Sequence, residues 1–568
     1  MLVFKNIDNL NVLINKYKKI TSTISLIRIL MLLVLVVEFI LLLSLKEYLT
    51  YGIALAITLV IFILLIIFTN KFYNIYDNLL DKDKCYKNHN LRRELKLNSF
   101  NDLGEDFKNK EDYKISDLDI FGRNSLYQYI TVAKTKKGRE LLASQLTKPK
   151  EMTSSFKDMV NSFANDEESI NIEASLYHFK NNKKVNYDEL LSVSENKIKF
   201  NPLFILPLLS FIGMIVYIVL IFTLGLNPYF LFVFAITNLF LSKIFLSNDI
   251  FKLDGGMYQE TVKAYLYVDD VIINSKLDQN RFNELKDSIK EEVSYLKKLN
   301  KIYGLFNLKK NSIIDIILNT LFVSDFFLIV YYNINTKSVS KIKNTFDNIA
   351  EIELALSLAN IGIDNEIYSI PKDGDIIDVE LMYHPLVKNC VANDIKFDHG
   401  IVLTGSNMSG KTTFMRTLAI NETLFNAGGI VCAKKYSAPR LKILTSLRAN
   451  DMLNEGISTF YAEILRMKEM MKYYKEERCL ILVDEIFKGT NTHDRVSASA
   501  SVIKKLLDSN SIFIISTHDF ELAKEDGILN YHFNEKYIDD KITFDYKIKS
   551  GASDTTNAIY LLKMADII

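Results

Sequence analysis

A glycine-rich segment in the C-terminal third of the chain has residue types and spacing that suit phosphate binding. The segment Gly405-Ser-Asn-Met-Ser-Gly-Lys-Thr412 matches the pattern G-x-x-x-x-G-K-[ST]. The apolar run Ile401-Val-Leu403 precedes it, and a helix-forming stretch, 413–425, follows. Glycines let backbone N–H groups turn onto phosphate oxygens at a helix N-terminus, which already favours anions. We therefore predict a nucleotide site, in which Lys411 reaches the β- and γ-phosphates.

The predicted ATP-binding residues form one continuous loop: Gly405, Ser406, Asn407, Met408, Ser409, Gly410, Lys411, Thr412 and Thr413. A second apolar run, Cys479-Leu-Ile-Leu-Val483, ends in an acidic pair. A strand there would bring Asp484 beside Mg²⁺, which Thr412 would also hold, and Glu485 would polarise the attacking water. A purely structural role is the alternative for Glu485. The expected cofactors are ATP and Mg²⁺.

A third apolar run, Ile512-Phe-Ile-Ile515, leads into Ser516-Thr-His518. A histidine just past a strand near the γ-phosphate can hydrogen-bond it, so His518 joins Glu485 as a catalytic candidate; an ordinary core or surface histidine is the alternative. Continuous apolar runs are typical of central strands covered on both faces. Residues 375–568 are therefore predicted to form an α/β P-loop ATPase domain.

The rest of the chain must position this site, and its apolar residues are concentrated in four runs. These are Ile29–Leu45, Tyr51–Phe68, Leu203–Leu224 and Tyr229–Leu246. Roughly 20 apolar residues cross a bilayer, and short connectors join the runs in pairs, so we predict two membrane hairpins with about four spans. Lysines and arginines lie before the first run and after the second run of each pair, away from the short connectors. This distribution predicts a multi-pass protein of the cell membrane with its termini and ATPase domain in the cytoplasm.

Two features of these apolar regions are ambiguous. Glu38 interrupts the first run. It could be a buried polar contact between spans or a transport-linked carboxylate, or it could be a protonated or hairpin-facing carboxyl without a role. A fifth apolar stretch, 313–334, contains Asp315 and Asp325. A central Asp is expensive in a membrane, so we expect a buried helix of the soluble core there, with a spanning segment as the alternative.

Composition excludes some classes of protein. The chain has 568 residues, a net charge of +1 and 24% charged residues, so it is neither a simple bundle of spans nor a globally basic nucleic-acid coat. Four widely separated cysteines have no metal-like spacing.

Between the apolar runs, the pattern is mostly helical. Residues 281–303 form an amphipathic pattern, with an apolar face of Phe282, Leu285, Ile289, Val293, Leu296, Leu299 and Tyr303. Its opposite face holds Lys286, Glu291, Glu292 and Lys297. This helix could act as a lever arm, or it could be an ordinary packed helix with a solvated face.

The predicted fold is thus multi-domain, with α-helical transmembrane hairpins, a mostly α-helical core and lever region, and the C-terminal α/β domain. The expected divisions are an N-terminal cytoplasmic segment (1–23), hairpin 1 (24–70), a helical linker (71–118), the first core part (119–200), hairpin 2 (201–247), the lever with the second core part (248–374) and the ATPase domain (375–568).

Four segments resemble, in order, the ATPase motifs of the MutS mismatch-repair family: Thr404-Gly-Ser-Asn-Met-Ser-Gly-Lys-Thr-Thr413 (Walker A), Ser458-Thr-Phe-Tyr-Ala-Glu463 (signature loop), Asp484-Glu-Ile-Phe-Lys-Gly-Thr-Asn-Thr492 (Walker B and the following loop) and Ser516-Thr-His-Asp-Phe-Glu-Leu522. His384-Pro-Leu386 and Asn393 resemble the entry to that ATPase domain. More weakly, 122–149 resembles the start of the MutS core domain, and 349–360 resembles the end of its lever.

The resemblance implies an ABC/MutS-type ATPase that works as a homodimer through this domain. Ser458 and Thr459 of one subunit would complete the partner's site in trans, and Gly489, Thr490 and Asn491 would form the D-loop. A γ-phosphate contacted by both subunits gives the closed dimer its differential affinity. In the family, the output of this closure is clamping on DNA.

The sequence also departs from the family. The mismatch-reading N-terminal domain with its Phe-x-Glu wedge is not expected before Asp119, and hairpin 2 interrupts the region near the DNA clamp. The C-terminal helical extension of MutS is not expected either. Cys390 stands where MutS has an aromatic residue against adenine, and Tyr546 is a candidate for the other ring. We expect a membrane-anchored MutS-like ATPase that couples ATP hydrolysis to a DNA transaction; the alternative is an ATP-driven protein that acts on membrane or envelope partners without DNA. An ABC transporter is a weaker reading, since no LSGGQ loop is present.

Overall fold

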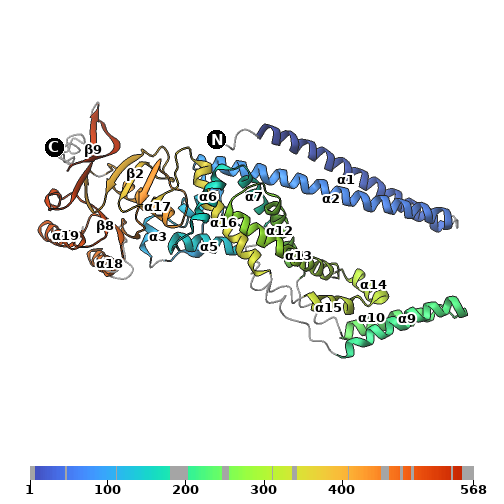
Figure 1. Cartoon of the computed structure of the whole chain (residues 1–568). Coiled ribbons are helices and arrows are strands. Elements are labelled where there is room, and N and C mark those ends of the chain that lie inside the picture. Colours follow the sequence, from blue (N-terminus) through green and yellow to red (C-terminus); the bar gives the residue numbers. More distant parts are fainter. Residues whose placement is uncertain are drawn as a thin grey trace. The chain divides into compact units, whose positions relative to one another are not determined.

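The computed structural model describes residues 7–44, 48–109, 112–179, 202–245, 255–309, 311–335, 342–406, 408–448, 459–473, 477–487, 491–538 and 541–552. These parts form a helical N-terminal region and a C-terminal α/β region, as the sequence predicts (Figure 1). The chain divides into two compact units. The first comprises Met1–Val132, Leu142–Ile170 and Ala355–Ile568, and the second comprises Ala133–Leu141 and Asn171–Leu354.

The N-terminal helices are long where the sequence is apolar and short where it is polar. In chain order they are α1 (Ile7–Ser44), α2 (Tyr48–Arg93), η2 (Leu97–Ser99), η3 (Glu105–Phe107), α3 (Tyr113–Asp117), α4 (Leu126–Ile130), α5 (Lys136–Thr147), α6 (Ser154–Asn165) and α7 (Glu168–Leu176). Helices α1 and α2 therefore run past the expected hairpin boundaries at residues 24 and 70.

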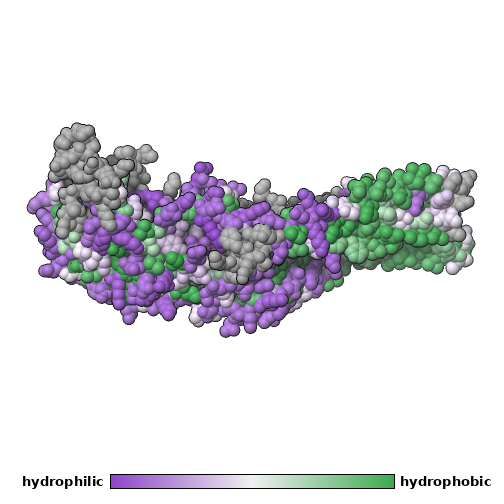
Figure 2. Space-filling model, turned by 90° about the horizontal axis from the view of Figure 1, so that it is seen from above, coloured by the Kyte–Doolittle hydropathy of each residue, from purple (hydrophilic) through white to green (hydrophobic). Residues whose placement is uncertain are grey.

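Helices α1 and α2 pack against each other as a hairpin and expose their apolar side chains. Both are long and apolar enough to cross a membrane. The exposed hydrophobic side chains form a continuous band on the right of Figure 2, over the far part of this hairpin. Within it, Glu38 accepts a hydrogen bond from Thr58 of the facing helix at 3.0 Å. Glu38 is thus a polar contact between the two helices.

The second unit contains the next helical elements along the chain: η5 (Pro202–Phe204), α9 (Ile205–Leu224), α10 (Phe230–Phe245), α12 (Gly255–Asn274), α13 (Asn280–Lys309), α14 (Ser312–Phe322) and α15 (Ser324–Asn335), with the first part of α16 (Lys343–Asp364). Helix α9 also meets the length and hydropathy expected of a span. Helix α10 has 16 residues, fewer than the roughly 20 that a span needs, so its pairing with α9 makes a hairpin of unequal arms.

The amphipathic helix predicted over 281–303 is present as α13 and is longer than expected. Its predicted apolar face is buried except for Val293, which is half-buried. Glu292 was expected on the solvated face, and this was wrong: Glu292 is buried and accepts hydrogen bonds from the backbone N–H and the hydroxyl of Thr345 at 2.8 and 2.6 Å. A tertiary partner for the carboxylate therefore overrides the helical pattern.

The stretch 313–334 was expected to be one buried helix, and this is also wrong. It consists of two helices, α14 and α15, bent by 90° at Val323. Much of its apolar surface is exposed; Ile313 is 70% accessible. Its acidic residues, in contrast, are buried.

The two parts of the second unit meet at a buried carboxylate. Glu353 of α16 accepts hydrogen bonds from the backbone N–H groups of Lys134 and Thr135 at 2.7 and 3.0 Å, and from the Thr135 hydroxyl. Gly138 lies so close that a Cβ there would be 1.9 Å from a Glu353 oxygen. Burial raises the pKa of Glu353 to about 7.

The C-terminal region contains two sheets. A six-stranded sheet has the order β10-β9-β4-β8-β7-β6 and is parallel except for β9–β10. Its strands are β4 (Gly400–Gly405), β6 (Lys442–Ser446), β7 (Cys479–Asp484), β8 (Ile512–Ser516), β9 (Leu529–Ile538) and β10 (Lys541–Ser550). A four-stranded sheet has the order β1-β5-β2-β3, from β1 (Lys372–Asp373), β2 (Ile377–Met382), β3 (Asn393–Phe397) and β5 (Lys435–Ala438).

Helices α17 (Lys411–Asn426), α18 (Thr459–Tyr473) and α19 (Thr492–Leu507) and the short η8 (Phe520–Lys524) complete this region. The central strands β4 and β8 are buried throughout, in agreement with the prediction from their apolar runs.

Helix α17 carries a fully buried acid. Glu422 accepts hydrogen bonds from the Tyr436 hydroxyl at 2.7 Å and from the Leu441 N–H at 3.3 Å. Burial raises the pKa of this carboxyl from 4.5 to about 8. The folded protein therefore keeps the proton over a pH range in which the unfolded chain has lost it.

The first prediction concerns this carboxyl. Because the folded state binds the extra proton, its stabilising contribution is complete below the unfolded pKa and decreases as pH rises from about 4.5 to about 8. Glu422→Gln should flatten the decrease in the melting temperature of the C-terminal region over that range. The exposed control Glu521→Gln should keep the wild-type slope. An unchanged slope in Glu422→Gln would contradict the buried, protonated state.

Candidate functional site

The glycine-rich loop connects β4 directly to α17. Gly405 and Gly410 have φ values of +137° and +112°. A Cβ at Gly405 would lie 2.7 Å from the carbonyl oxygen of Phe533, so only glycine fits this backbone. Gly410 caps the N-terminus of α17, whose first residue is Lys411. The ammonium of Lys411 donates to the carbonyls of Gly405 and Ser406 at 2.7 and 2.9 Å and so lies along the loop.

The other loop residues differ in their surroundings. Ser406 donates to the carboxylate of Glu535 at 2.8 Å, whereas the buried hydroxyl of Ser409 has no hydrogen-bond partner among the described residues. Met408 has a φ of +67° and an 87% exposed side chain. Thr413 is exposed on the first turn of α17. Asn407 lies outside the described residues.

Asp484 is the centre of a cluster of oxygen atoms at the carboxyl ends of the parallel strands. Strands β7 and β8 pair in a register that places Asp484 opposite Ser516. The Asp484 carboxylate accepts one hydrogen bond from Thr412 at 2.6 Å and another from the Ser516 hydroxyl. Ser516 therefore belongs to the cluster, although sequence reasoning gave it no role. The sequence signal that could have identified Ser516 is its position at the end of an apolar run, like that of Asp484 at the end of another.

Glu485 and His518 lie side by side next to this cluster. Nε2 of His518 is 3.1 Å from Oε1 of Glu485. Both side chains are partly exposed, at 40% and 29% of their surface. Glu485 has a φ of +61°, which is uncommon for a residue with a side chain and costs on the order of 1–3 kcal/mol. Its N–H bonds the Ser516 carbonyl at 3.1 Å, and this holds the strained turn.

Helix α19 holds the loop that carries His518 through a side-chain ion pair. Arg495 donates to both oxygens of Asp519 at 2.8 and 2.7 Å, a bidentate pair of the strong kind. The backbone N–H of Asp519 also donates a hydrogen bond to the Thr517 hydroxyl at 3.0 Å, which restricts the backbone of this loop. The position of His518 is therefore determined by a second element of the domain.

An aromatic ring lies beside the loop on the side of β10. Tyr546 has a φ of +51° within a register shift between β9 and β10, and its ring would be 3.3 Å from a Cβ at Gly410. Asn393 holds this bulge by donating to the Tyr546 carbonyl at 3.0 Å and accepting from the Ile548 N–H at 2.9 Å. Tyr546 is 45% exposed, so part of its side chain is accessible to a planar group.

The residues upstream of the site are structural in character. Cys390 is half-buried, and its sulfur accepts a hydrogen bond from the His384 N–H at 3.3 Å. Burial is the main cause that lowers the pKa of His384 to about 4, with a smaller effect of Arg416. His384 is therefore neutral near pH 7, and its Nδ1 accepts from the Leu386 N–H at 3.2 Å.

Some predicted residues are not placed at the site. Ser458, Gly489 and Thr490 lie outside the described residues. Thr459 is the first residue of α18, and Asn491 caps α19 by accepting from the Asp494 N–H at 2.9 Å. The described structure of one chain thus brings together Thr412, Asp484, Glu485 and His518, but it does not place the signature serine.

A cavity of about 720 Å³ is separate from this site and is lined by none of the loop residues. Two of the cations that line it have partners: Arg466 pairs with Asp117, and Lys442 lies 3.1 Å from Glu477. We assign it no ligand.

The fold and the cluster together define an α/β domain in which a glycine loop, a hydroxyl and a strand-end carboxylate converge. Residues 401–567 match the family model of MutS domain V. The C-terminal part of this chain belongs to the MutS family.

Curated relatives give the same family. The chain is 32% identical over 251 residues to "DNA mismatch repair protein MutS" of Clostridium kluyveri, which covers 41% of this chain and 29% of the relative. It is 35% identical over 187 residues to the protein of that name from Leptospira interrogans, covering 32% and 22%. The Bacteroides thetaiotaomicron protein is 28% identical over 250 residues, covering 40% and 29%. The chain thus matches less than a third of the length of these relatives.

The second prediction concerns the ring beside the loop. If a base stacks on Tyr546, Tyr546→Ala should weaken ATP binding roughly tenfold, because stacking on an aromatic side chain is worth about 1–3 kcal/mol per base. Tyr546→Phe keeps the ring and should bind ATP like the wild type. Calorimetry on the full chain would measure both, with inorganic triphosphate as a ligand that has no base. Equal loss of triphosphate binding in Tyr546→Ala would show a damaged loop rather than a lost stack.

Proposed function

We propose that this chain binds and hydrolyses ATP as a MutS-type ATPase that is anchored in a membrane. One observation carries the ATPase proposal: Thr412, Asp484 and Ser516 form one hydrogen-bonded cluster, with the Glu485–His518 pair next to it. The motif order and the match to MutS domain V support it.

The donor set fits Mg²⁺, which prefers oxygen ligands and few protein groups. Thr412 and Asp484 would hold the ion, and their oxygens are already 2.6 Å apart. A bound Mg²⁺ would neutralise charge on the β- and γ-phosphates. Gly405 and Gly410 give the loop the backbone shape that turns N–H groups inward, and Lys411 adds a positive charge along it.

Glu485 is the residue best placed to orient and polarise a water. Its carboxylate follows Asp484 directly and points toward the imidazole of His518. His518 can hold that carboxylate in one orientation and sense the γ-phosphate at the same time. The strained backbone at Glu485 is consistent with a catalytic position, because strain of this kind gathers where a side chain must be aimed.

The third prediction tests this assignment. Glu485→Gln keeps the size of the side chain and a hydrogen-bonding oxygen but removes the negative charge, so ATP should still bind while turnover falls by a factor of about 10²–10⁴. ATP binding and phosphate release by the full chain would be measured together. Exposed Glu521→Gln is the matched control and should hydrolyse ATP normally. Near-normal hydrolysis by Glu485→Gln would remove this residue from its role.

The proposed active form is a homodimer. In the MutS resemblance, Ser458 and Thr459 of one subunit contact the γ-phosphate held at Lys411 of the other. The segment that carries them leads into α18, which packs beside β6 in the same domain. ATP binding would then close the dimer, and hydrolysis would release it.

The membrane location is supported by surface chemistry. Apolar side chains are exposed along α1, α2 and α9, such as Leu33, Ile57 and Val216. Exposed apolar surface of this extent is unfavourable in water and marks a membrane or partner surface. The lysines and arginines at the ends of the hairpins favour the orientation in which the termini and the ATPase domain are cytoplasmic.

Coupling to DNA is the proposed output, because the curated relatives are named for DNA mismatch repair. One observation favours a second candidate, an output on the membrane or on envelope partners. The long helix α13 ends at Lys309, and this lysine lies 3.0 Å from Asp315 of the exposed apolar pair α14–α15. The end of the expected lever thus contacts apolar elements directly.

The fourth prediction separates these outputs. If DNA is the partner, homoduplex, mismatched, branched or single-stranded DNA should stimulate the ATPase of the full chain in nanodiscs. Binding should weaken with salt, with a slope set by the number of phosphate contacts. The Glu485→Gln variant is the control for turnover. If none of the four DNAs binds or stimulates at any salt concentration, the DNA proposal fails and the membrane output is favoured.

A further inference from the structure

Helices α14 and α15 form a broken helical pair in the second unit. The break is at Val323, which is completely buried and has a φ of +46°. This backbone conformation is an outlier for a β-branched residue, so the surrounding structure must impose it. The bend of 90° between α14 and α15 is therefore fixed by the packing around Val323.

The outer surface of α14 is apolar and exposed. Six of its side chains are accessible: Ile313, Ile314, Ile316, Ile317, Leu321 and Phe322. An exposed apolar surface of this kind is unfavourable in water, and the neighbouring helix indicates what covers it. Helix α14 packs along α10, whose own outward residues, such as Phe240, are also exposed. The apolar surface of α14 is therefore continuous with that of the α9–α10 hairpin.

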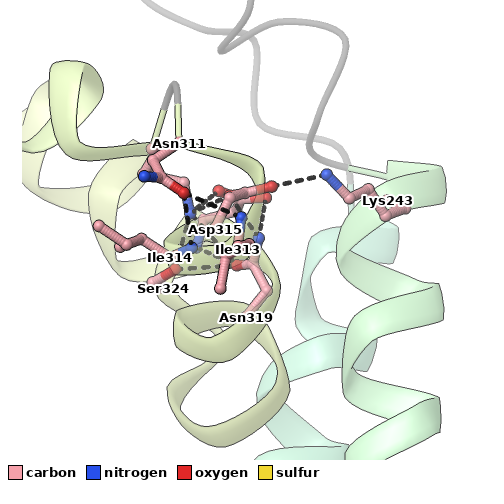
Figure 3. Close-up of polar contacts among 9 residues, drawn as sticks. Lys243, Asn311, Ile313, Ile314, Asp315, Asn319 and Ser324 are labelled. Atoms are coloured by element: carbon pink, nitrogen blue, oxygen red, sulfur yellow. Dashed lines mark hydrogen bonds and ion pairs between the residues drawn. The ribbon is translucent and has the colours of Figure 1, made fainter.

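Two contacts give the direction and depth of α14. Near its start, Asp315 pairs with Lys243 at the end of α10, at 2.6 Å (Figure 3). Five residues further on, the Thr320 carbonyl accepts a hydrogen bond from Asn238 in the middle of α10, at 3.2 Å. Helix α14 thus runs antiparallel to α10 and stops near its midpoint. Its 11 residues extend about 16 Å, roughly half of the hydrocarbon core.

The inner face of the pair contains charges that balance. Lys309 lies against Asp315 and Asp325, and Lys243 lies against Asp315. Two lysines and two aspartates therefore form one neutral cluster, and all but Lys243 are nearly inaccessible. Charges are tolerated within a membrane when they face the protein interior and pair with one another.

Asn319 satisfies the polar groups at the break. Its amide donates to Asp315 at 3.0 Å and to Asp325 at 2.9 Å. Its carbonyl accepts from the Ser324 hydroxyl at 2.9 Å and from the Asp325 N–H at 3.0 Å. Figure 3 shows the side chains of Asp315, Asn319 and Ser324 close together. A helix break at membrane depth requires that freed backbone groups have protein partners, and here the N–H after the break has one.

We propose that α14–α15 enters one leaflet of the lipid bilayer beside α10 without crossing it, and that Lys309 joins the end of α13 to it. This inference rests on the proposed membrane location. After the bend, α15 packs against α13, with the ring centroids of Phe306 and Tyr332 6.0 Å apart. The pair would therefore return toward the side from which it entered, and the ATPase domain would stay on the same side as α13. Movement of α13 would then be transmitted to a membrane-embedded element through buried ion pairs.

The fifth prediction uses the absence of tryptophan from the sequence, which makes any introduced tryptophan a unique fluorophore. Ile313→Trp, Ile317→Trp and Leu321→Trp would be made one at a time in the full chain in bilayers that contain brominated lipids. These positions are exposed, so each substitution alters little packing. We expect blue-shifted emission and quenching by lipid bromine at all three, with shallow bromines quenching Ile313→Trp best and deep bromines quenching Leu321→Trp best.

Two controls separate this inference from the membrane proposal itself. Ile215→Trp on α9 should report lipid, and Lys297→Trp on α13 should be quenched by aqueous iodide only. Iodide quenching at Ile317→Trp with lipid quenching at Ile215→Trp would overturn the inference alone. Protection of Ile317→Trp from both quenchers would indicate a protein cover and would also overturn it. Iodide quenching at Ile215→Trp would overturn the proposed membrane location as well.

Discussion

The site depends on one carboxylate that three elements share. Asp484 ends β7, accepts a hydrogen bond from Thr412 at the start of α17, and accepts another from Ser516 at the end of β8. These contacts require that β4, β8 and β7 lie side by side in one parallel register. The strained turn at Glu485 follows, because the chain must leave β7 while its N–H still reaches β8. The catalytic candidates are therefore consequences of strand order as much as of residue type.

The second unit is organised by buried charges of a different kind. Glu353 joins α16 to the 133–141 segment through three donors, and Glu292 joins α13 to the start of α16 through Thr345. At the far end of α13, Lys309 and two aspartates connect this helix to α14–α15. Each of these buried groups has a partner, as the high cost of an unpaired buried charge demands. Polar contacts thus attach α13 near its middle, at Glu292, and at its C-terminal end, at Lys309, which suits a rigid element that transmits movement.

Local patterns predicted those features that depend on neighbours in the chain. The glycine spacing predicted a loop between β4 and α17, and the apolar runs predicted buried central strands. The helical periodicity of 281–303 predicted α13. These features were accessible because backbone conformation and periodic burial are encoded within a few residues of one another. The prediction failed where a distant partner decided the outcome, as at Glu292 and in the stretch 313–334, where buried partners for two aspartates replaced a single helix by a broken pair.

Sequence patterns alone predict the family resemblance of the C-terminal part, the order of its motifs and the positions of the long apolar helices. Three contacts are visible only in the folded chain: Ser516 completes the Asp484 cluster, Tyr546 lies beside Gly410, and Asn319 bonds both aspartates at the break between α14 and α15. Each of these contacts is made in space between residues whose local sequence gives no reason for pairing. Strand register, a bulge and a bend set those contacts, and all three arise when the chain packs and must satisfy its buried polar groups.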